Sequence, residues 1–471
     1  MSAAYQSGLK LSVQGRHAEA IAQFEQALTQ NPNDIKVLFA LGNTAGQLGL
    51  AQAAEQFFRQ VLVLEPTRLE AIVNLANLLR ESAQYDAAIA LLEPALAREP
   101  QSPELLLTLG SAWREKGNFL EARKRYEAAL AASPNYVPAL ANLADMLCDS
   151  GDRQGARTLY DSAIKADPKN AQARLNRAVL HLLNGDLKEG WRDYAARTEV
   201  PGKVPVPAGE QRLAPWTGGP LKRIRLLVRA EQGLGDQILF AGLVPDLAAR
   251  ACAEGGSVIV ECDPRLVPLF ARSFPQVAIR PATIKTIAGA PVADYGWLKA
   301  AGGANAAVLM GSLPKYLRGA LDSFPNPHCF LVPDTAQTAR WRRFFQDNSQ
   351  GRKIIGISWR SGKIGGGDRS LQFAPLQAWA QFLRGTDASF VCAQYAATDQ
   401  EIATLEMLSG RKILVPQGLD QKNELDRTCA MLAALDVLIS APTAVSWLAA
   451  GAGVPTLKLL YSTVWTALGQ S

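Results

Sequence analysis

The chain has 471 residues, enough for about three domains of roughly 150 residues each. Hydrophobic residues make up 48% and charged residues 20%, which excludes a disordered chain, a collagen and a disulfide-dense mini-protein. The net charge of +6 is small for this length and gives no reason to infer nucleic-acid binding.

Cysteine and histidine usage narrows the class further. The six cysteines are scattered and form no Cys-x-x-Cys pair, which indicates reduced thiols. The chain has only three histidines, scattered along the sequence, which disfavours a multi-histidine metal site. The N-terminus lacks the apolar core of a signal peptide, and no run of about 18 apolar residues occurs. We therefore expect a cytoplasmic protein without membrane insertion.

Prolines recur every 34 residues through the first part of the chain. Each ends a predicted helix, because proline lacks the N–H that helix continuation needs. Small residues recur in phase where antiparallel helices must approach closely, and large apolar residues between them fill the gap to the next unit. In order, these sets are Pro32, Pro66, Pro100, Pro134 and Pro168; Ala20, Ala54, Ala88, Ala122 and Ala156; Phe24, Phe58, Leu92, Tyr126 and Tyr160.

This pattern resembles the tetratricopeptide repeat (TPR), with five full units over residues 1–170 and a partial sixth to about 197. A TPR array stacks into a superhelix whose concave face binds peptides or helices, so the resemblance implies a protein partner. The sixth position of a unit holds asparagine at Asn74, Asn142 and Asn176. This resembles the asparagine ladder of O-GlcNAc transferase superhelices, whose amides hold a peptide backbone. The alternative is that these asparagines pack the helices together.

Two aromatic residues, Trp191 and Tyr194, replace small residues near the end of the array. They suit a last repeat that caps the array against a following domain. Residues 198–220 are rich in Pro and Gly and predict a linker.

Two blocks of alternating strands and helices follow, over 221–345 and 346–471. Such blocks predict two Rossmann-like domains that face a cleft, so the fold class is α + α/β, an α-solenoid followed by two Rossmann-like domains. The first block opens with an apolar strand and the turn Gly233-Leu-Gly235-Asp236. A dinucleotide fingerprint needs a third glycine where Ile238 stands, which disfavours a dehydrogenase.

Residues 221–471 resemble GT-B glycosyltransferases of the heptosyltransferase type, and the whole chain resembles bacterial TPR-fused protein glycosyltransferases. The segment 440–455 is most similar to the flagellin-modifying members, which are associated with nonulosonic acids such as pseudaminic acid. The resemblance implies transfer of a sugar from a nucleotide sugar to Ser or Thr of a protein acceptor, expected to be flagellin. The Asp-x-Asp of metal-dependent glycosyltransferases is absent from the sequence, so we expect neither a metal nor a resident cofactor.

The first block carries the candidate acceptor side. In heptosyltransferases the aspartate of a matching Gly-x-Gly-Asp turn is the general base on the acceptor hydroxyl. The resemblance implies this catalytic role for Asp236, with Gly233 and Gly235 beside the acceptor. The alternative is that Asp236 caps the following helix. Glu231 is a second carboxylate close in sequence.

The second block carries the candidate donor side. Arg360, Ser361 and Lys363 follow its first strand and predict binding of the donor phosphate; the alternative is a solvated basic loop. Arg369, beyond a run of glycines, is also assigned to the donor; the alternative is that it contacts the acceptor. We also assign a later turn to donor binding, because it precedes a helix whose N-terminus favours an anion. The alternative is that this turn is purely structural. The residues that open that helix are Thr443 and Ala444.

The sequence differs from heptosyltransferases and other GT-B enzymes in two features, which bear on the choice of function. Heptosyltransferases have Asp-Thr-Gly-Leu-x-His where this chain has Pro442 and Trp447 at the charged positions, which disfavours ADP-heptose. The chain also stops at Ser471, whereas GT-B enzymes continue into helices that cross back, so we expect a truncated or a minimal variant. The alternatives are a UDP-GlcNAc-dependent protein O-glycosyltransferase and a non-catalytic TPR adaptor with a degenerate GT-B half.

Overall fold

A computed structural model describes most of the chain. It forms two compact units, the first ending at Leu180 and the second beginning at His181. The domain limits expected at 197, 220 and 345 stay predictions. The described residues are 2–200, 204–207, 213–231, 233–287, 290–325, 329–361, 373–460 and 465–468.

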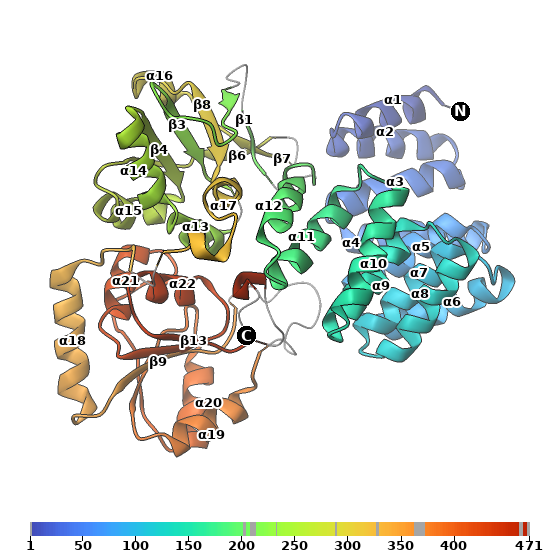
Figure 1. Cartoon of the computed structure of the whole chain (residues 1–471). Coiled ribbons are helices and arrows are strands. Elements are labelled where there is room, and N and C mark those ends of the chain that lie inside the picture. Colours follow the sequence, from blue (N-terminus) through green and yellow to red (C-terminus); the bar gives the residue numbers. More distant parts are fainter. Residues whose placement is uncertain are drawn as a thin grey trace. The chain divides into compact units, whose positions relative to one another are not determined.

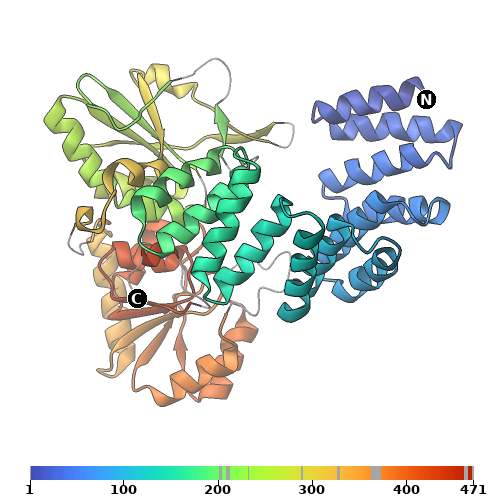
Figure 2. The same cartoon turned by 45° about the vertical axis from the view of Figure 1, so that its right-hand side comes forward.

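The first unit is a series of antiparallel helix pairs, which follow one another along the chain (Figures 1 and 2). Glycines with positive φ, among them Gly15 (75°) and Gly117 (90°), make the turn within most pairs, and Ala83 (58°) does so in the third. The helices are α1 (Ala3–Val13), α2 (His17–Gln30), α3 (Ile35–Gln47), α4 (Ala51–Leu64), α5 (Leu69–Glu81), α6 (Tyr85–Arg98), α7 (Pro103–Glu115), α8 (Phe119–Ala132), α9 (Val137–Asp149), α10 (Arg153–Ala166) and α11 (Ala171–Leu183), which runs past Leu180 into the second unit.

Glycines on the first helix of three pairs receive an aromatic ring from the second. A Cβ atom on Gly42 would lie 2.7 Å from the Phe58 ring, and the same relation holds between Gly110 and Tyr126. Phe58 and Tyr126 are fully or almost fully buried. The third pair has Ala76 and the smaller Leu92 at the equivalent positions. In the first four pairs a larger residue on the first helix thus goes with a smaller one on the second, as close packing requires.

The second unit contains a first sheet of five parallel strands in the order β2-β8-β3-β4-β5. Central strands β3 and β4 are buried on both faces, as expected for parallel strands covered by helices. The strands are β2 (Ala214–Pro215), β3 (Arg225–Arg229), β4 (Ser257–Cys262), β5 (Ala278–Pro281) and β8 (Ala306–Leu309). A small sheet beside it has β1 (Val206–Pro207), β6 (Ile284–Ile287) and β7 (Ala290–Ala293). The helices are α12 (Leu187–Tyr194), α13 (Leu234–Ala241), α14 (Val244–Glu254), α15 (Val267–Ser273), α16 (Trp297–Ala300) and α17 (Leu313–Leu317), with the 3-10 turn η1 (Ala195–Thr198) after α12.

The second sheet is also parallel, in the order β11-β10-β9-β12-β13. Its core includes Ile357, Phe390 and Leu438, none of which is exposed. The strands are β9 (Ile354–Ser358), β10 (Ser389–Cys392), β11 (Ile413–Leu414), β12 (Val437–Ser440) and β13 (Thr456–Lys458). The helices are α18 (Thr335–Ser349), which packs on α21 and β9 (Figure 1), α19 (Leu376–Gly385), α20 (Asp399–Ser409), α21 (Leu425–Leu432) and α22 (Ala444–Gly451).

The strand order reverses once in each sheet. In the first sheet the chain passes from the edge strand β2 to the central strand β3, adds β4 and β5 on one side, and then returns to the other side as β8, between β3 and β2. In the second sheet it enters at the central strand β9, adds β10 and β11 on one side, and then crosses to β12 on the other. In open α/β sheets, ligands bind outside the carboxyl ends of the strands at such a reversal. The expected α-solenoid followed by a region of parallel sheets is confirmed, whereas its assignment to the GT-B fold stays a prediction.

The packing of glycine against an aromatic ring can be tested in the second helix pair. Gly42→Ala forces the Phe58 ring aside, and overpacking of this kind costs about 1–3 kcal/mol, partly offset by about 1 kcal/mol of better helix propensity. Phe58→Leu leaves a gap. The double variant recreates the Ala76–Leu92 arrangement, so we expect it to be more stable than the sum of the two single changes by about 1 kcal/mol.

Urea unfolding followed by far-UV circular dichroism measures this coupling. If the losses of stability in the two single variants simply add up in the double variant, the proposed packing of Gly42 against Phe58 is contradicted. A control cycle that pairs Gly42→Ala with Tyr126→Leu, two repeats away, is expected to be additive.

Candidate functional site

Helices α13 and α22 start at the carboxyl ends of β3 and β12, beside the reversal point of each sheet, and contact each other. A Cβ atom on Gly235 would lie 3.5 Å from Trp447 Cδ1 and 3.8 Å from the Cα atom of Ala444. These are ordinary van der Waals separations, so the first turns of the two helices are in direct contact at Gly235. The predicted acceptor turn and the predicted donor turn therefore lie side by side, although they are far apart in the sequence.

Asp236 lies in the first turn of α13 and is partly buried. Burial, and then the charge of Glu231, raise the pKa of its carboxyl group, while a hydrogen bond from the Gly233 N–H opposes the rise. Gly233 is the N-cap residue of α13, so this bond also satisfies a free N–H group of the helix end. Asp236 thus makes the contact with the helix end that the alternative role, helix capping, requires. The raised pKa is what a proton acceptor needs, and its catalytic role stays a prediction.

Glu231, the other carboxylate of this turn, is held in a buried ion pair. Its two oxygens accept hydrogen bonds from Arg197 at 2.6 and 3.0 Å, and one also accepts the Gly311 N–H at 2.7 Å. Arg197 is 3% exposed and also donates to Ser312 Oγ at 2.8 Å. The pair joins η1 to the end of β3, so Glu231 acts in positioning the turn rather than as a free base. Sequence reasoning missed Arg197, because only the fold brings it to Glu231.

The guanidinium group of Arg360 is engaged within the second sheet. It pairs with both carboxylate oxygens of Glu401 at 2.5 and 2.7 Å and also donates to the Ala396 carbonyl. These contacts help to lower the pKa of Glu401 to about 2. The backbone N–H of Arg360 donates to Gln394 Oε1.

The structure leaves the donor roles of the other residues of this loop untested. Ser361 is described by the structure and has an interaction partner. Lys363 and Arg369 lie outside the described residues. The donor roles of all four loop residues stay predictions.

Thr443 is the N-cap residue of α22, but its side chain makes no capping hydrogen bond. It is 8% exposed, and its Oγ1 has no partner among the described residues. The backbone N–H groups of Ala444 and Val445, at the start of the helix, likewise have no partner in the described chain. This turn therefore offers hydrogen-bond donors without acceptors of their own, as an anion site does.

Lys458 is a cation that sequence reasoning missed. It pairs with Ser440 in the register of β13 and β12, and its Nζ lies 2.8 Å from the centroid of the Trp447 ring. Burial lowers its pKa to about 7. Across the described residues, no carboxylate lies within ion-pair distance of it. The available signal was a single lysine inside the apolar strand 455–460.

The predicted asparagine ladder is hydrogen-bonded inside the first unit. Asn74 donates to Asn43 Oδ1 at 2.8 Å, and Asn176 donates to Asp145 Oδ1 at 3.1 Å. Asn142 donates to Ser111 Oγ at 3.3 Å. Each bond joins one repeat to the preceding one, as expected if these asparagines pack the helices together. The two asparagines of the first bond also line a hollow of about 370 Å³, so they are accessible to a peptide.

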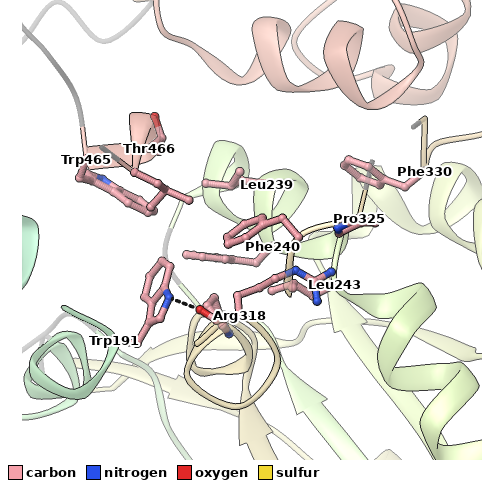
Figure 3. A pocket seen from close by; sticks show the side chains of 13 residues that line it. Trp191, Leu239, Phe240, Leu243, Arg318, Pro325, Phe330, Trp465 and Thr466 are labelled. Atoms are coloured by element: carbon pink, nitrogen blue, oxygen red, sulfur yellow. Dashed lines mark hydrogen bonds between the residues drawn. The ribbon is translucent and has the colours of Figure 1, made fainter. Parts of the chain in front are cut away.

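An apolar pocket of about 250 Å³ lies beside the end of α13 (Figure 3). Trp191 from α12 donates its indole N–H to the Arg318 carbonyl at 2.9 Å, and its ring meets Trp465 edge-on. Tyr194 packs on Phe240. Trp191 and Tyr194 are thus both buried within the second unit, and their capping of the repeat array stays a prediction.

A second buried carboxylate, Glu261, ends β4. It accepts the Ala230 N–H at 3.1 Å and the Tyr295 hydroxyl at 3.2 Å, while Oε1 has no partner in the described chain. Burial raises the pKa of Glu261 to about 7. No group of three or more His, Cys, Asp or Glu in the described ranges could hold a metal ion. Likewise, no described helix is long and apolar enough to cross a membrane.

Comparison with known proteins identifies the repeats. The tetratricopeptide repeat family matches residues 14–62, 73–137 and 142–202. This protein contains TPR repeats. TTC0263, a thermophilic TPR protein of Thermus thermophilus, is 24% identical with a TM-score of 0.33, over 37% of this chain and 95% of that one. PilW, a type IV pilus biogenesis factor, is 21% identical with a TM-score of 0.34, over 42% and 86%.

A longer similarity reaches the second unit. Protein FlbA of Caulobacter vibrioides is 31% identical over 293 residues, which are 62% of this chain and 48% of that protein. The chain therefore spans about half the length of this relative. Because the first unit ends at Leu180, a match of 293 residues must also include part of the second unit.

The buried Glu261 predicts a pH dependence of stability. A carboxyl group whose pKa is raised on folding binds more protons in the native state, so the free energy of unfolding falls as pH rises from about 4.5 to 7. The loss is on the order of 3 kcal/mol for this shift. Glu261→Gln cannot titrate, and we expect it to remove that part of the pH dependence.

Urea unfolding at several pH values, followed by tryptophan fluorescence, measures the effect, because every tryptophan except Trp113 follows residue 180. The exposed Glu99→Gln is the control and should keep the wild-type slope. An unchanged pH profile in Glu261→Gln would show that the native carboxyl group titrates normally.

Proposed function

We propose that this protein is a glycosyltransferase that takes a sugar from a nucleotide donor and attaches it to a protein acceptor held by the TPR repeats. The second sheet binds the nucleotide, and the turn after β3 receives the acceptor hydroxyl. Asp236 accepts the hydroxyl proton. No metal is assigned a role.

The observation that carries this proposal is the contact of α13 with α22 at Gly235. It brings a carboxylate of raised pKa, Asp236, next to a helix N-terminus that favours an anion. A transferase of this kind needs both, a base for the incoming hydroxyl and donors for the departing phosphate. The two turns also stand at the reversal points of two parallel sheets, where ligands of open α/β sheets bind.

The finer assignment rests on the family resemblance. A nonulosonic acid such as pseudaminic acid is the proposed sugar, and serine or threonine hydroxyls of flagellin are the proposed acceptors. The repeats supply a protein-binding surface, and the hollow beside Asn43 and Asn74 is the part of it with polar side chains suited to a peptide backbone.

A non-catalytic adaptor is the second candidate, and the loop after β9 favours it. Glu401 and Gln394 satisfy the guanidinium and the backbone N–H of Arg360, so two groups suited to a donor phosphate are used internally. An adaptor would keep the repeats and bind no nucleotide.

Nucleotide binding separates the two candidates. We expect CMP to raise the melting temperature, whereas UDP, GDP and ADP should not. A ligand at 100 times its dissociation constant stabilises the native state by about 2.7 kcal/mol. A selective shift with UDP would replace the nonulosonic donor by UDP-GlcNAc. No shift with any of the four, each compared with its nucleoside, would favour the adaptor.

The proposed base is tested by Asp236→Asn. The amide still accepts the Gly233 N–H, so we expect an almost unchanged melting temperature and unchanged CMP binding. Transfer from a CMP-activated nonulosonic acid to flagellin should fall about 10²–10⁴-fold, the usual contribution of a general base. Asp322→Asn, an exposed aspartate of the first-sheet region, is the control. Transfer at the wild-type rate in Asp236→Asn would leave the residue as a helix cap only.

A further inference from the structure

Lys458 has an unusual environment for a lysine. Its side chain is partly buried, its amino group lies on the face of Trp447, and no described carboxylate balances its charge. Burying a cation without a counter-ion is unfavourable, and the lowered pKa reports this cost. The aromatic face offsets part of it through a cation–π interaction. A bound anion would remove the rest.

The groups around Lys458 are hydrogen-bond donors. Its strand neighbour Ser440 leads directly into the turn that ends at Thr443, and the Trp447 ring on which it rests belongs to the first turn of α22. Thr443 Oγ1 is more than nine-tenths buried and has no partner among the described residues. A hydroxyl group, helix N–H groups and an ammonium group thus all belong to the carboxyl ends of β12 and β13 and the turn that follows β12.

This donor set fits a phosphate better than other anions. A phosphoryl group has three acceptor oxygens, which suit donors of three kinds arriving from different directions. A carboxylate has two oxygens in one plane and is recognised best by the planar fork of arginine. Arg360, which follows the neighbouring strand β9, is already paired with Glu401.

We propose that Lys458 is the cation that binds and neutralises the phosphate of the nucleotide at the N-terminus of α22, together with Thr443. This rests on the proposed function. In the transfer step the acceptor oxygen forms a bond to the anomeric carbon of the sugar. The bond from that carbon to the phosphate oxygen breaks, and its electron pair stays on the phosphate. The hydroxyl proton goes to Asp236, and Lys458 stabilises the charge left on the released nucleotide.

The test measures binding by calorimetry in the full chain, with CMP, cytidine and inorganic pyrophosphate as probes. Lys458→Met removes the charge but keeps an unbranched side chain over Trp447, so the fold should persist. We expect it to weaken CMP and pyrophosphate about 10- to 100-fold, the range for hydrogen bonds to charged groups. Binding of cytidine, which lacks the phosphate, should not change.

Three further variants serve as controls and as a second test of the phosphate site. Lys458→Arg keeps the charge and should bind CMP within a few-fold of wild type. Lys412→Met, an exposed lysine of the second-sheet region, should bind as wild type. Thr443→Val should weaken CMP without altering charge, which tests the phosphate site through its second residue. If Lys458→Met fails to fold, Lys458→Gln takes its place and should weaken CMP to the same extent.

The outcomes separate this proposal from the proposed function. If wild type and Lys458→Met bind CMP equally, the assignment of Lys458 is overturned while the nucleotide-dependent function stands. If pyrophosphate binds in a Lys458-dependent manner but no nucleotide binds, the phosphate site stands and the glycosyltransferase does not. If neither pyrophosphate nor any nucleotide binds wild type, both are overturned.

Discussion

The close approach of α13 and α22 at Gly235 is the constraint on which the second unit depends. A Cβ atom at this position would be in ordinary van der Waals contact with Trp447 and the backbone of Ala444, so only a larger side chain would push the two helix N-termini apart. In the proposed function, the distance between these helix starts decides whether Asp236 and the turn at Thr443 can act on one substrate. The direct packing of the two helices therefore links the turn after β3 to the turn after β12.

The buried ion pair of Arg197 with Glu231 holds the other side of the same turn. Its two charges are almost completely shielded from water, and such a pair contributes little net stability, yet breaking it is costly because one charge is left alone. The Gly311 N–H and the Ser312 hydroxyl complete its hydrogen bonds. The turn after β3 is thus oriented by Arg197 and Glu231, which are engaged with each other, and Asp236 is the other carboxylate of this turn and the proposed base.

Much of the fold could be predicted, because its signals are local. The proline period and the matched sizes of Phe24, Phe58 and Tyr126 with small partners record contacts between consecutive helices. The alternation of strands and helices likewise predicted parallel sheets. The site was harder, since ion-pair partners come from distant segments. Arg360 and Lys458 look alike as basic residues after or within a strand, but Arg360 meets Glu401 and Lys458 meets no described carboxylate.

The sequence by itself determined the TPR repeat and the succession of strands and helices along the chain. It also determined the two turns that carry Gly235, Asp236 and Thr443. These features follow from periodicity and from the backbone demands of glycine and proline, which act over a few residues. Only the tertiary structure decided which charges are free. A charge is neutralised by whatever lies within about 4 Å of it, and that neighbour is set by strand order and helix packing rather than by distance along the chain.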